Sequence, residues 1–583
     1  MPLTDPSLSD HFMRNAPWRM DVVRRSVLYA CSPMTSPNEF DSLRAALRDP
    51  SAYSEARGED VRFEETHISV VALVGDRAYK IKKPFDLGFL DFSTPEKRRA
   101  ACEDEVRLNR RLAPSWYLGV APIMLDASGR ARVGAVREPD DADEPARDGE
   151  RLAAHAVVMR RLPEEGMLGS VLDRAGAGEA TGFDLDDAMA RLGEDLAAFH
   201  ASCATGGEID AFAAPDAVRT RIHRNVDEAT EKGEAPRGPL SAALLGYVRA
   251  ASAGAIEGLR DEMTARAGAG RAREGHGDLH TGNICLTGEG PVVFDCIEFS
   301  KRLRCMDVAA ELAFLGMDLE RRGRSDLSRA LFGTYERASS DDGLGALQPL
   351  YRAHFACVRA KVTALRAGSM EEGTAAREEA SEAAQRWLVH AFSYLAAPVV
   401  VLTCGLPASG KSHSARTLAE ALRGELIQSD VVRKALAGRA PSDRAGAGDD
   451  AGMYSEDFTQ RTYESMLASA VAAIDAGRSV VVDATFQTVA RRAPFIGAAQ
   501  AMGRPCAVLW RDIDDETARE RLAARASDRD EPSDADWRVY RLLKPVFEPP
   551  GAGECVVVRA DPGVSAHGAL LRVCEALAGR AAG

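Results

Sequence analysis

The feature that most constrains this chain is a glycine-rich loop between an apolar strand and a helix. The loop reads Gly405-Leu-Pro-Ala-Ser-Gly410-Lys411-Ser412 and follows the apolar run VVVLT at residues 399–403. The two glycines let backbone N–H groups curl around a phosphate, and the following helix adds a positive dipole. The lysine then reaches the β and γ oxygens, and the serine hydroxyl can bind Mg²⁺. The loop predicts a nucleotide site in a parallel α/β domain.

The rest of this half supports that fold class. Residues 396–583 alternate short apolar strands, such as VVVDA, CAVLW and CVVVRA, with helical segments. Continuous apolar strands of this kind are typical of a buried parallel sheet. One of them ends in Asp483, where a carboxylate near Mg²⁺ is expected at the carboxyl edge of the sheet. Capping of the next turn is an equally open role for Asp483. We expect a P-loop NTPase domain over residues 396–583.

Another strand of this domain ends in an acid and a base three residues apart, Asp430 and Arg433. This segment resembles the second strand of P-loop kinases of the polynucleotide-kinase and zeta-toxin type. The resemblance implies that Asp430 is a general base for an acceptor hydroxyl that attacks the γ-phosphorus in line. The alternative is that Asp430 caps the helix over residues 431–436, because Asp is favoured at that position. The two roles are compatible.

Several arginines lie on a later helical segment of the same domain, over residues 519–529. The segment resembles the lid helix of such kinases, in which arginines close on ATP and spread the charge of the transition state. The resemblance favours Arg525 as the residue with this role. A solvated basic helix face is the alternative.

The first two-thirds of the chain needs a separate fold, because 583 residues exceed what one core supports. Residues 1–33 lack periodicity and are expected to be a flexible extension. Residues 66–74 and 77–82 alternate apolar and polar side chains around Gly75-Asp76, which predicts a hairpin. A helix is expected from the capping-box spacing Ser93-Thr-Pro95-Glu96. Residues 137–151 predict a polar loop, and helical patterns dominate the remainder up to residue 395.

A second group of chemically active residues reads His276-Gly-Asp278-Leu-His280-Thr-Gly-Asn283, with Asp295 after the next strand. This segment resembles the catalytic segment of the aminoglycoside phosphotransferase and choline-kinase branch of the protein-kinase-like fold. The step from the aspartate to the asparagine matches the template H-R-D-x-x-x-x-N. The resemblance implies that Asp278 deprotonates an acceptor hydroxyl. It implies that Asn283 and Asp295 hold Mg²⁺ beside the ATP phosphates.

A site of this kind also needs a strand lysine and a helix glutamate. Lys80 ends a segment similar to V-A-I-K, and Lys82 points to the same face of the strand, so it stays an alternative. Glu105 shares an apolar helix stripe and is predicted to face inward, whereas Glu103 lies among arginines. No G-x-G-x-x-G precedes the strand, so the covering of the phosphates is not defined. The resemblance spans roughly residues 60–390.

The layout as a whole resembles proteins described as bifunctional aminoglycoside phosphotransferase/ATP-binding proteins. It implies an α+β protein-kinase-like domain over residues 34–395, followed by the α/β P-loop domain. The activity it implies is ATP-dependent phosphotransfer at two Mg-ATP sites to hydroxyl groups of small molecules. A nucleotide-dependent switch with a ligand-sensing kinase-like domain is one alternative. A polynucleotide 5′-hydroxyl kinase is another.

The composition limits which partners and which cell compartment we expect for this chain. The net charge of −14 supplies no basic field for polyanions, which argues against nucleic acid. The eleven cysteines form no C-x-x-C pair, which favours a reducing compartment. No apolar run approaches the length of a membrane span, and the N-terminus lacks a signal pattern. We therefore expect a cytoplasmic protein without a membrane partner. The acceptor and the oligomeric state are not defined by the sequence.

Overall fold

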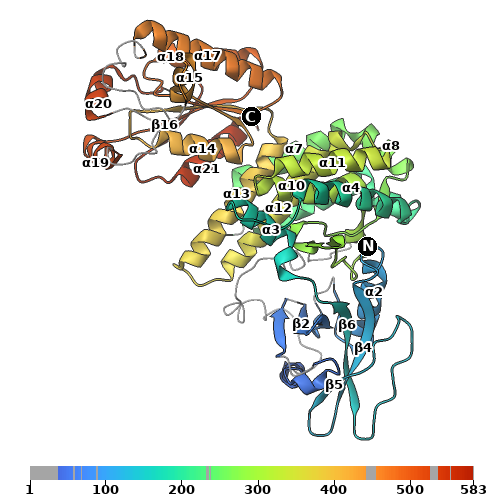
Figure 1. The fold of residues 1–583 in the computed structure, drawn as a ribbon. Coiled ribbons are helices and arrows are strands. Elements are labelled where there is room, and N and C mark those ends of the chain that lie inside the picture. The colour runs from blue at the N-terminus through green and yellow to red at the C-terminus, as the bar shows by residue number, and fades with distance from the viewer. Residues whose placement is uncertain are drawn as a thin grey trace. The chain divides into compact units, whose positions relative to one another are not determined.

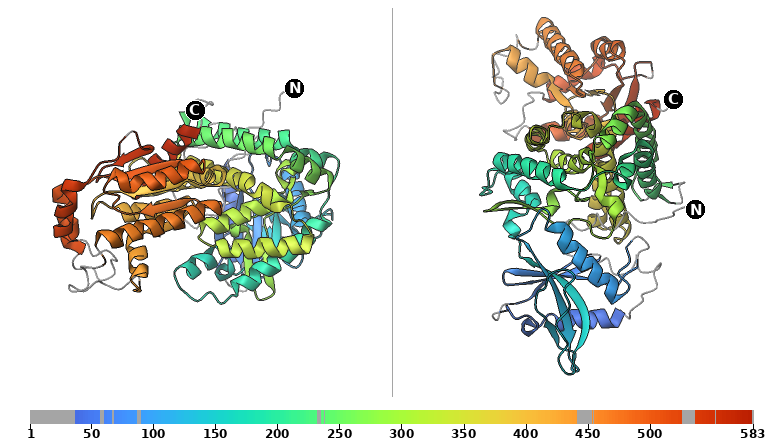
Figure 2. Two further views of the ribbon diagram at one scale, coloured as in Figure 1. Left: turned by 90° about the horizontal axis from the view of Figure 1, so that it is seen from above. Right: turned by 90° about the vertical axis from the view of Figure 1, so that its right-hand side faces the viewer.

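The computed structural model divides the chain into two compact units, which are described separately (Figures 1 and 2). The first unit contains Met1–Gly233 and Ala253–Ser381, and the second contains Glu234–Ser252 and Glu382–Gly583. The N-terminal extension predicted over residues 1–33 lies outside the described residues. Those are residues 37–56, 60–66, 68–86, 90–231, 235–236, 238–440, 453, 455–525, 536–551 and 553–581.

The first unit begins with an antiparallel six-stranded sheet in the order β1-β2-β3-β6-β4-β5. One face packs on α2, and the other face carries an apolar cluster with α1. Because side chains alternate along β3, Tyr79 and Ile81 join the α1 cluster while Lys80 and Lys82 point to the opposite face. The elements are α1 (Pro37–Ala46), β1 (Arg62–Glu65), β2 (Ser69–Val74), β3 (Arg77–Lys82), α2 (Pro95–Asn109), β4 (Tyr117–Leu125), β5 (Ala131–Val133) and β6 (Arg151–Arg160).

The hairpin predicted around Gly75-Asp76 is confirmed as β2–β3, and the polar segment over residues 137–151 is largely a loop. The start of α2 differs from the prediction by one residue. Thr94, not Ser93, is the N-cap, and its side chain accepts a hydrogen bond from Lys97 N. Proline is favoured at the first helical position, so Pro95 places the cap immediately before itself.

The remainder of the first unit is mainly helical. α4 packs on α11, and α10 packs on α11 and α12. Two short antiparallel pairs, β9 with β12 and β10 with β11, flank the segment His276–Asn283. The elements are α3 (Leu168–Gly176), α4 (Leu185–Ser202), α5 (Glu208–Ala213), α6 (Pro215–Glu228), α8 (Arg260–Gly268), β9 (Ala272–Glu274), β10 (Ile284–Thr287), β11 (Gly290–Val293), α9 (Lys301–Arg304), β12 (Cys305–Asp307), α10 (Val308–Arg321), α11 (Ser325–Ser339) and α12 (Leu344–Gly368).

The second unit contains the predicted parallel sheet, with five strands in the order β14-β15-β13-β16-β17. Helices α17 and α18 pack together on one face, and α14 and α21 pack together on the other. The elements are β13 (Val400–Cys404), α14 (Lys411–Ala421), β14 (Glu425–Gln428), α15 (Ser429–Leu436), α17 (Glu456–Asp475), β15 (Val480–Asp483), α18 (Val489–Ala501), β16 (Cys506–Arg511), α19 (Asp515–Arg525), α20 (Trp537–Leu543), β17 (Val556–Ala560) and α21 (Ala566–Ala581).

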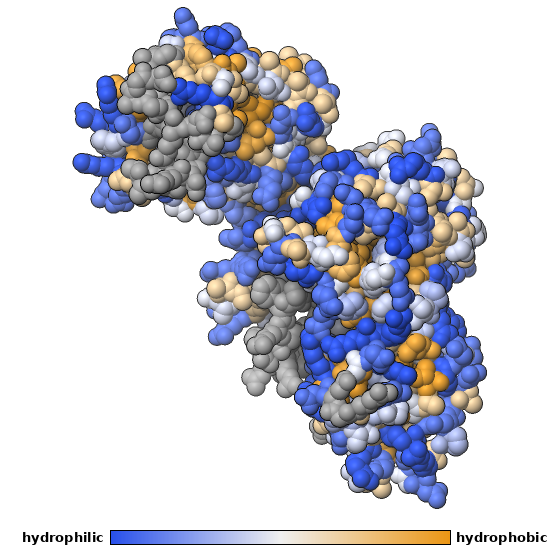
Figure 3. All heavy atoms as spheres, viewed as in Figure 1, coloured by the Kyte–Doolittle hydropathy of each residue, from blue (hydrophilic) through white to orange (hydrophobic). Residues whose placement is uncertain are grey.

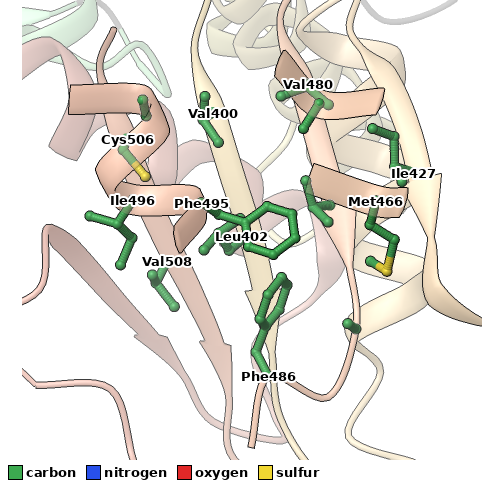
Figure 4. Packing of buried hydrophobic residues seen from close by; sticks show 14 of the residues in the cluster. Val400, Leu402, Ile427, Met466, Val480, Phe486, Phe495, Ile496, Cys506 and Val508 are labelled. Atoms are coloured by element: carbon green, nitrogen blue, oxygen red, sulfur yellow. The ribbon is translucent and has the colours of Figure 1, made fainter. Parts of the chain in front are cut away.

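Aromatic and aliphatic side chains fill the space between this sheet and α17–α18. Leu402 of β13 lies beside Phe495 of α18 and Phe486 (Figure 4). The rings of Phe486 and Phe495 meet edge to face with centroids 5.2 Å apart, an arrangement preferred by aromatic pairs. This core fixes the carboxyl edge of the sheet, where the phosphate loop begins.

The boundary between the units falls within α13 (Ala375–Leu395) and not at residue 395. The C-terminal half of α13 groups with the second unit because it contacts the start of α7 (Ala242–Gly258), which also belongs to that unit. The rings of Tyr247 and Phe392 pack at a tilted angle with centroids 4.9 Å apart, and Gln385 Nε2 donates to Pro239 O at 3.0 Å. Among the described residues, no helix is long and apolar enough to cross a membrane. Hydrophilic residues dominate the face shown in Figure 3, with scattered apolar ones.

Candidate active sites

Two lysines of β3 share one glutamate in the first unit. Lys80 Nζ donates to Glu105 Oε1 at 2.7 Å and to Asp295 Oδ1 at 2.6 Å. Lys82 Nζ contacts the other carboxylate oxygen of Glu105 and also the carboxylate of Glu298. Only Lys80 thus joins both the predicted helix glutamate and the predicted metal-binding aspartate. The deeper Lys82 has a fully buried side chain.

Helix α2 fixes Glu105 and links it to the segment after Asp295. Glu105 is fully buried. One turn later, Asn109 Nδ2 donates to Glu105 O at 2.9 Å, and its Oδ1 accepts from Cys296 N at 2.8 Å. Glu103 points elsewhere, to Arg99 at 3.0 Å. The prediction that Glu105 faces inward while Glu103 lies among arginines matches this geometry.

Asp295 has a left-handed backbone conformation, with φ of 63°. Its N–H donates to the hydroxyl of Tyr117 at 3.1 Å, and burial raises the pKa of that hydroxyl well above its usual range, so it stays protonated. A non-glycine residue in this conformation costs of order 1 kcal/mol or more, and its surroundings must hold it there. The strained backbone aims the carboxylate of Asp295 at Lys80.

The loop from His276 to Asn283 places Asp278 in a nearly fully buried position. Asn283 Nδ2 donates to Asp278 O at 2.9 Å and to Asp278 Oδ2 at 3.0 Å. His280 Nε2 lies 3.6 Å from the same carboxylate oxygen. Asn283 thus orients the carboxylate of Asp278. Carboxylate and amide oxygens of this kind fit Mg²⁺.

The support beneath this loop was not predicted from the sequence. Glu311 of α10 accepts from His276 N at 2.7 Å and Gly277 N at 2.5 Å. Its second oxygen lies 2.7 Å from His200 Nε2. Burial would raise the pKa of Glu311, but the hydrogen bond and charge of His200 outweigh it and lower that pKa. Gly277 has φ of 87°, and a Cβ there would lie 2.9 Å from Leu303 O.

The predicted phosphate loop of the second unit joins β13 to α14. Gly405 and Gly410 have φ of 150° and 86°, and Ala408 has a left-handed φ of 64°. A Cβ on Gly405 would lie 2.4 Å from Arg511 O, so only glycine fits there. Lys411 is the first residue of α14, whose N-terminus begins at the loop. The cradle and the helix N-terminus fit a nucleotide phosphate.

Asp483 is the last residue of β15, and its carboxylate contacts side chains of the two neighbouring strands, β13 and β14. Its Oδ1 accepts from Thr403 Oγ1 at 2.8 Å and its Oδ2 from Gln428 Nε2 at 3.2 Å. Asp430 lies in the first turn of α15, but Gln428 is the N-cap. The alternative of Asp430 as the helix cap is therefore wrong, because the helix begins at Ser429, two residues before the predicted start at residue 431. Its carboxylate still lies at a helix N-terminus, where negative charge is favoured.

Two arginines contact the phosphate loop: Arg521 of the predicted arginine-rich segment over residues 519–529, and Arg511, which was not predicted. Arg521 donates to Ala408 O at 3.3 Å. Arg511 donates to Ser409 O at 3.4 Å and to Val564 O at 2.8 Å. The side chain of Arg525, the residue favoured from the sequence, lies outside the described part of α19. Arg511 could have been singled out from its position, because it is the last residue of β16, the strand next to β13.

Comparison with known proteins agrees with this architecture. Residues 91–350 match the Phosphotransferase enzyme family, and residues 400–550 match a family described as AAA domain. The chain is 32% identical over 429 residues to an uncharacterized protein of Mycobacterium tuberculosis (strain H37Rv), covering 73% of this chain and 78% of that protein. A protein of Mycobacterium bovis matches with the same figures.

Solved structures with similarity include kinases. A choline/ethanolamine kinase family protein from Mesorhizobium loti is 14% identical with a TM-score of 0.35, covering 66% of this chain and 100% of that one. A gluconokinase from Sinorhizobium meliloti is 20% identical with a TM-score of 0.23, covering 32% and 95%.

The two matched domains define the class: this is an ATP-dependent kinase with a protein-kinase-like domain followed by a P-loop domain. More particularly, the chain belongs to the family, shared with the mycobacterial proteins, that joins an aminoglycoside-phosphotransferase-like domain to a P-loop kinase-like domain.

Proposed function

We propose that the chain has two separate Mg-ATP sites, each of which transfers the γ-phosphate of ATP to a hydroxyl group of a small molecule. The observation that carries this proposal is the contact of Lys80 with both Glu105 and Asp295, in a unit separate from the phosphate loop. An assembled lysine, glutamate and aspartate are what a kinase-like site requires for turnover. The phosphate loop of the second unit supplies an independent nucleotide cradle.

In the first unit, Asp278 is the proposed general base. The hydrogen bonds from Asn283 hold its carboxylate in one orientation, so it can accept the proton of an acceptor hydroxyl without reorganisation. Asn283 and Asp295 would hold Mg²⁺, which neutralises negative charge on the phosphates. Lys80, paired with two carboxylates, would hold the α and β phosphates.

In the second unit, Lys411 and the loop N–H groups would bind the phosphates, and Ser412 and Asp483 would hold the metal. Asp430 is the proposed general base, on the strength of its place after β14 at the carboxyl edge of the sheet. Arg521 adds a positive charge beside the loop, where it can stabilise charge that develops on the transferring group.

The test is a coupled ADP-release screen over sugars, aminoglycosides, nucleosides and amino alcohols, run on wild type, Asp278→Asn and Lys411→Ala. We expect acceptors whose stimulation of ADP release is lost in one variant and retained in the other. ADP release that no acceptor stimulates would contradict the proposal and would instead indicate a nucleotide switch. Stimulation by oligonucleotide 5′-hydroxyls alone would indicate a polynucleotide kinase.

A further inference from the structure

A buried cluster of basic and polar side chains lies between α6 and α12, which pack together in the first unit. Arg221 and Asn225 stand one turn apart on the buried face of α6. On α12, His354 and Lys361 are two turns apart and are also buried. None of these four residues belongs to the proposed ATP sites. We call this group the α6–α12 cluster.

Positive charge in the cluster exceeds negative charge. Lys361 Nζ donates to Glu228 Oε2 at 2.6 Å, and Arg224 Nε lies 3.7 Å from the other oxygen of the same carboxylate. One carboxylate thus serves two cations. Within the described part of the chain, Arg221 donates hydrogen bonds to two backbone oxygens, Phe212 O and Cys305 O, both at 3.3 Å. A buried cation without a carboxylate is costly.

The groups that act on Arg221 lack a carboxylate. Burial is the main cause that lowers its pKa to about 10, and the nearby Arg224 and Arg302 lower it further, while the partners that raise it are Tyr351 and Cys305. Burial also lowers the pKa of His354 to about 3, and Arg221, Lys361 and Arg224 add to that shift. The positive charge around these helices therefore disfavours the binding of any further cation.

Two polar side chains in the cluster have atoms without a hydrogen-bond partner within the described part of the chain. Asn225 is fully buried, yet neither its Nδ2 nor its Oδ1 makes a hydrogen bond. His354 is 6% exposed, and its Nδ1 makes none. Buried polar groups are nearly always satisfied in native proteins, so a bound group or an ordered water is expected to contact each of these atoms. The surplus positive charge indicates that this group is an anion.

We propose that the α6–α12 cluster binds a small oxyanion, a phosphate or carboxylate group, through Arg221 and Lys361 with Asn225 and His354 as neutral hydrogen-bonding partners. Arginine and lysine are the usual ligands for such groups, and a buried site strengthens charge-assisted hydrogen bonds. Glu228 and Arg224, whose side chains are 20% and 22% exposed, form the side of the cluster nearest to solvent. The anion is either a free ion or the anionic end of a larger molecule.

The test is the Asn225→Asp variant, which changes one side-chain atom and places a carboxylate among the cations. Thermal unfolding is followed at constant ionic strength with increasing inorganic phosphate, with acetate and with glycerol 3-phosphate. We expect the wild-type melting temperature to rise and saturate with phosphate or acetate. The variant should melt higher without added anion, and its affinity for the anion should fall by about tenfold or more, because like charges repel.

Gln348→Glu is the matched control, since it makes the same chemical change at a buried position of α12 whose amide contacts Ala309 O of α10. It should keep the wild-type response to phosphate. Phosphate that binds at either ATP site acts equally in all three proteins, so the difference between them isolates the cluster. A response to glycerol 3-phosphate would show that the site accepts the anionic end of a larger molecule.

Equal responses to phosphate in wild type and Asn225→Asp would overturn the proposal. If Asn225→Asp does not fold, Asn225→Leu replaces it, because removal of the unsatisfied amide should weaken phosphate binding without adding charge. A full wild-type response in Asn225→Leu would then overturn the proposal in the same way.

Discussion

Lys80 Nζ lies 2.6 Å from Asp295 Oδ1, across 215 residues of sequence. The same ammonium contacts Glu105, while Lys82 two residues later contacts the second oxygen of Glu105 and the carboxylate of Glu298. The two lysines of β3 therefore have different surroundings. Lys80 faces the predicted metal-binding aspartate, Asp295. Lys82 is fully buried and contacts Glu105 and Glu298.

Lys80→Met and Lys82→Met should have different effects: the first should mainly lower turnover, and the second should mainly lower stability. Lys80→Met should lower turnover in the first unit by about 10²-fold or more, since it removes a preorganised cation, with a small effect on stability because Glu105 keeps its contact with Lys82. Lys82→Met should destabilise the unit by about 3–5 kcal/mol, the usual effect of removing one partner of a buried ion pair. Chemical denaturation and ADP release, measured on both variants, check this. The reverse pattern would assign the nucleotide contact to Lys82.

Asp278→Asn should lower acceptor-dependent turnover in the first unit by about 10²- to 10⁴-fold, the range for loss of a general base. The substitution keeps the shape of the side chain. Binding of a non-hydrolysable ATP analogue should therefore persist, and the ratio of turnover to binding is the measurement. Turnover within a few-fold of wild type would exclude Asp278 as the base.

Arg521→Ala should lower turnover at the phosphate loop by about tenfold or more, because it removes a cation beside the loop. Arg519 of the same helix is the matched control, since its guanidinium lies 5.8 Å from the ring of Trp537. ADP release is measured in an Asp278→Asn background, so that only the second unit contributes. Equal losses in both arginine variants would show that the effect comes from the helix and not from the loop contact.

The stability of the first unit should depend on pH through His354. Burial, aided by Arg221, Lys361 and Arg224, lowers its folded pKa to about 3, whereas the unfolded value is about 6.5. Below pH 6.5 the unfolded chain takes up the proton and the folded chain does not, so stability present above that pH is lost as the pH falls. From pH 6.5 to 5.0 the loss is about 2 kcal/mol.

His354→Gln removes this titration. Denaturant unfolding at pH 7, 6 and 5 in phosphate-free buffer should show a shallower decline for the variant than for wild type. Other histidines with lowered pKa values, such as His276, contribute equally to both proteins. Parallel declines would show that His354 titrates normally in the folded state.

Local patterns predicted much of the fold and supplied the residues of both proposed sites. The parallel sheet followed from continuous apolar strands, and the segment from His276 to Asn283 followed from its spacing. The start of α2 was one residue off, because Pro95 determines the position of the cap more strongly than the capping-box spacing does.

Other contacts between distant segments, beyond those of Lys80 with Glu105 and Asp295, were not predicted from the sequence. The pairing of Lys82 with Glu298 joins residues 216 positions apart, and Glu311 reaches the loop at His276 from the helix α10. No periodicity specifies which buried carboxylate meets which backbone N–H. The α6–α12 cluster was not predicted from the sequence either, since its residues occupy ordinary core positions of two helices.

The most direct test of the central claim is the number of nucleotide sites. Calorimetric titration with a non-hydrolysable ATP analogue and Mg²⁺ should give two sites per chain in wild type and one in each of Lys80→Met and Lys411→Ala, with no binding in the double variant. One site in wild type, or loss of all binding in Lys411→Ala alone, would contradict the account of two separate ATP sites.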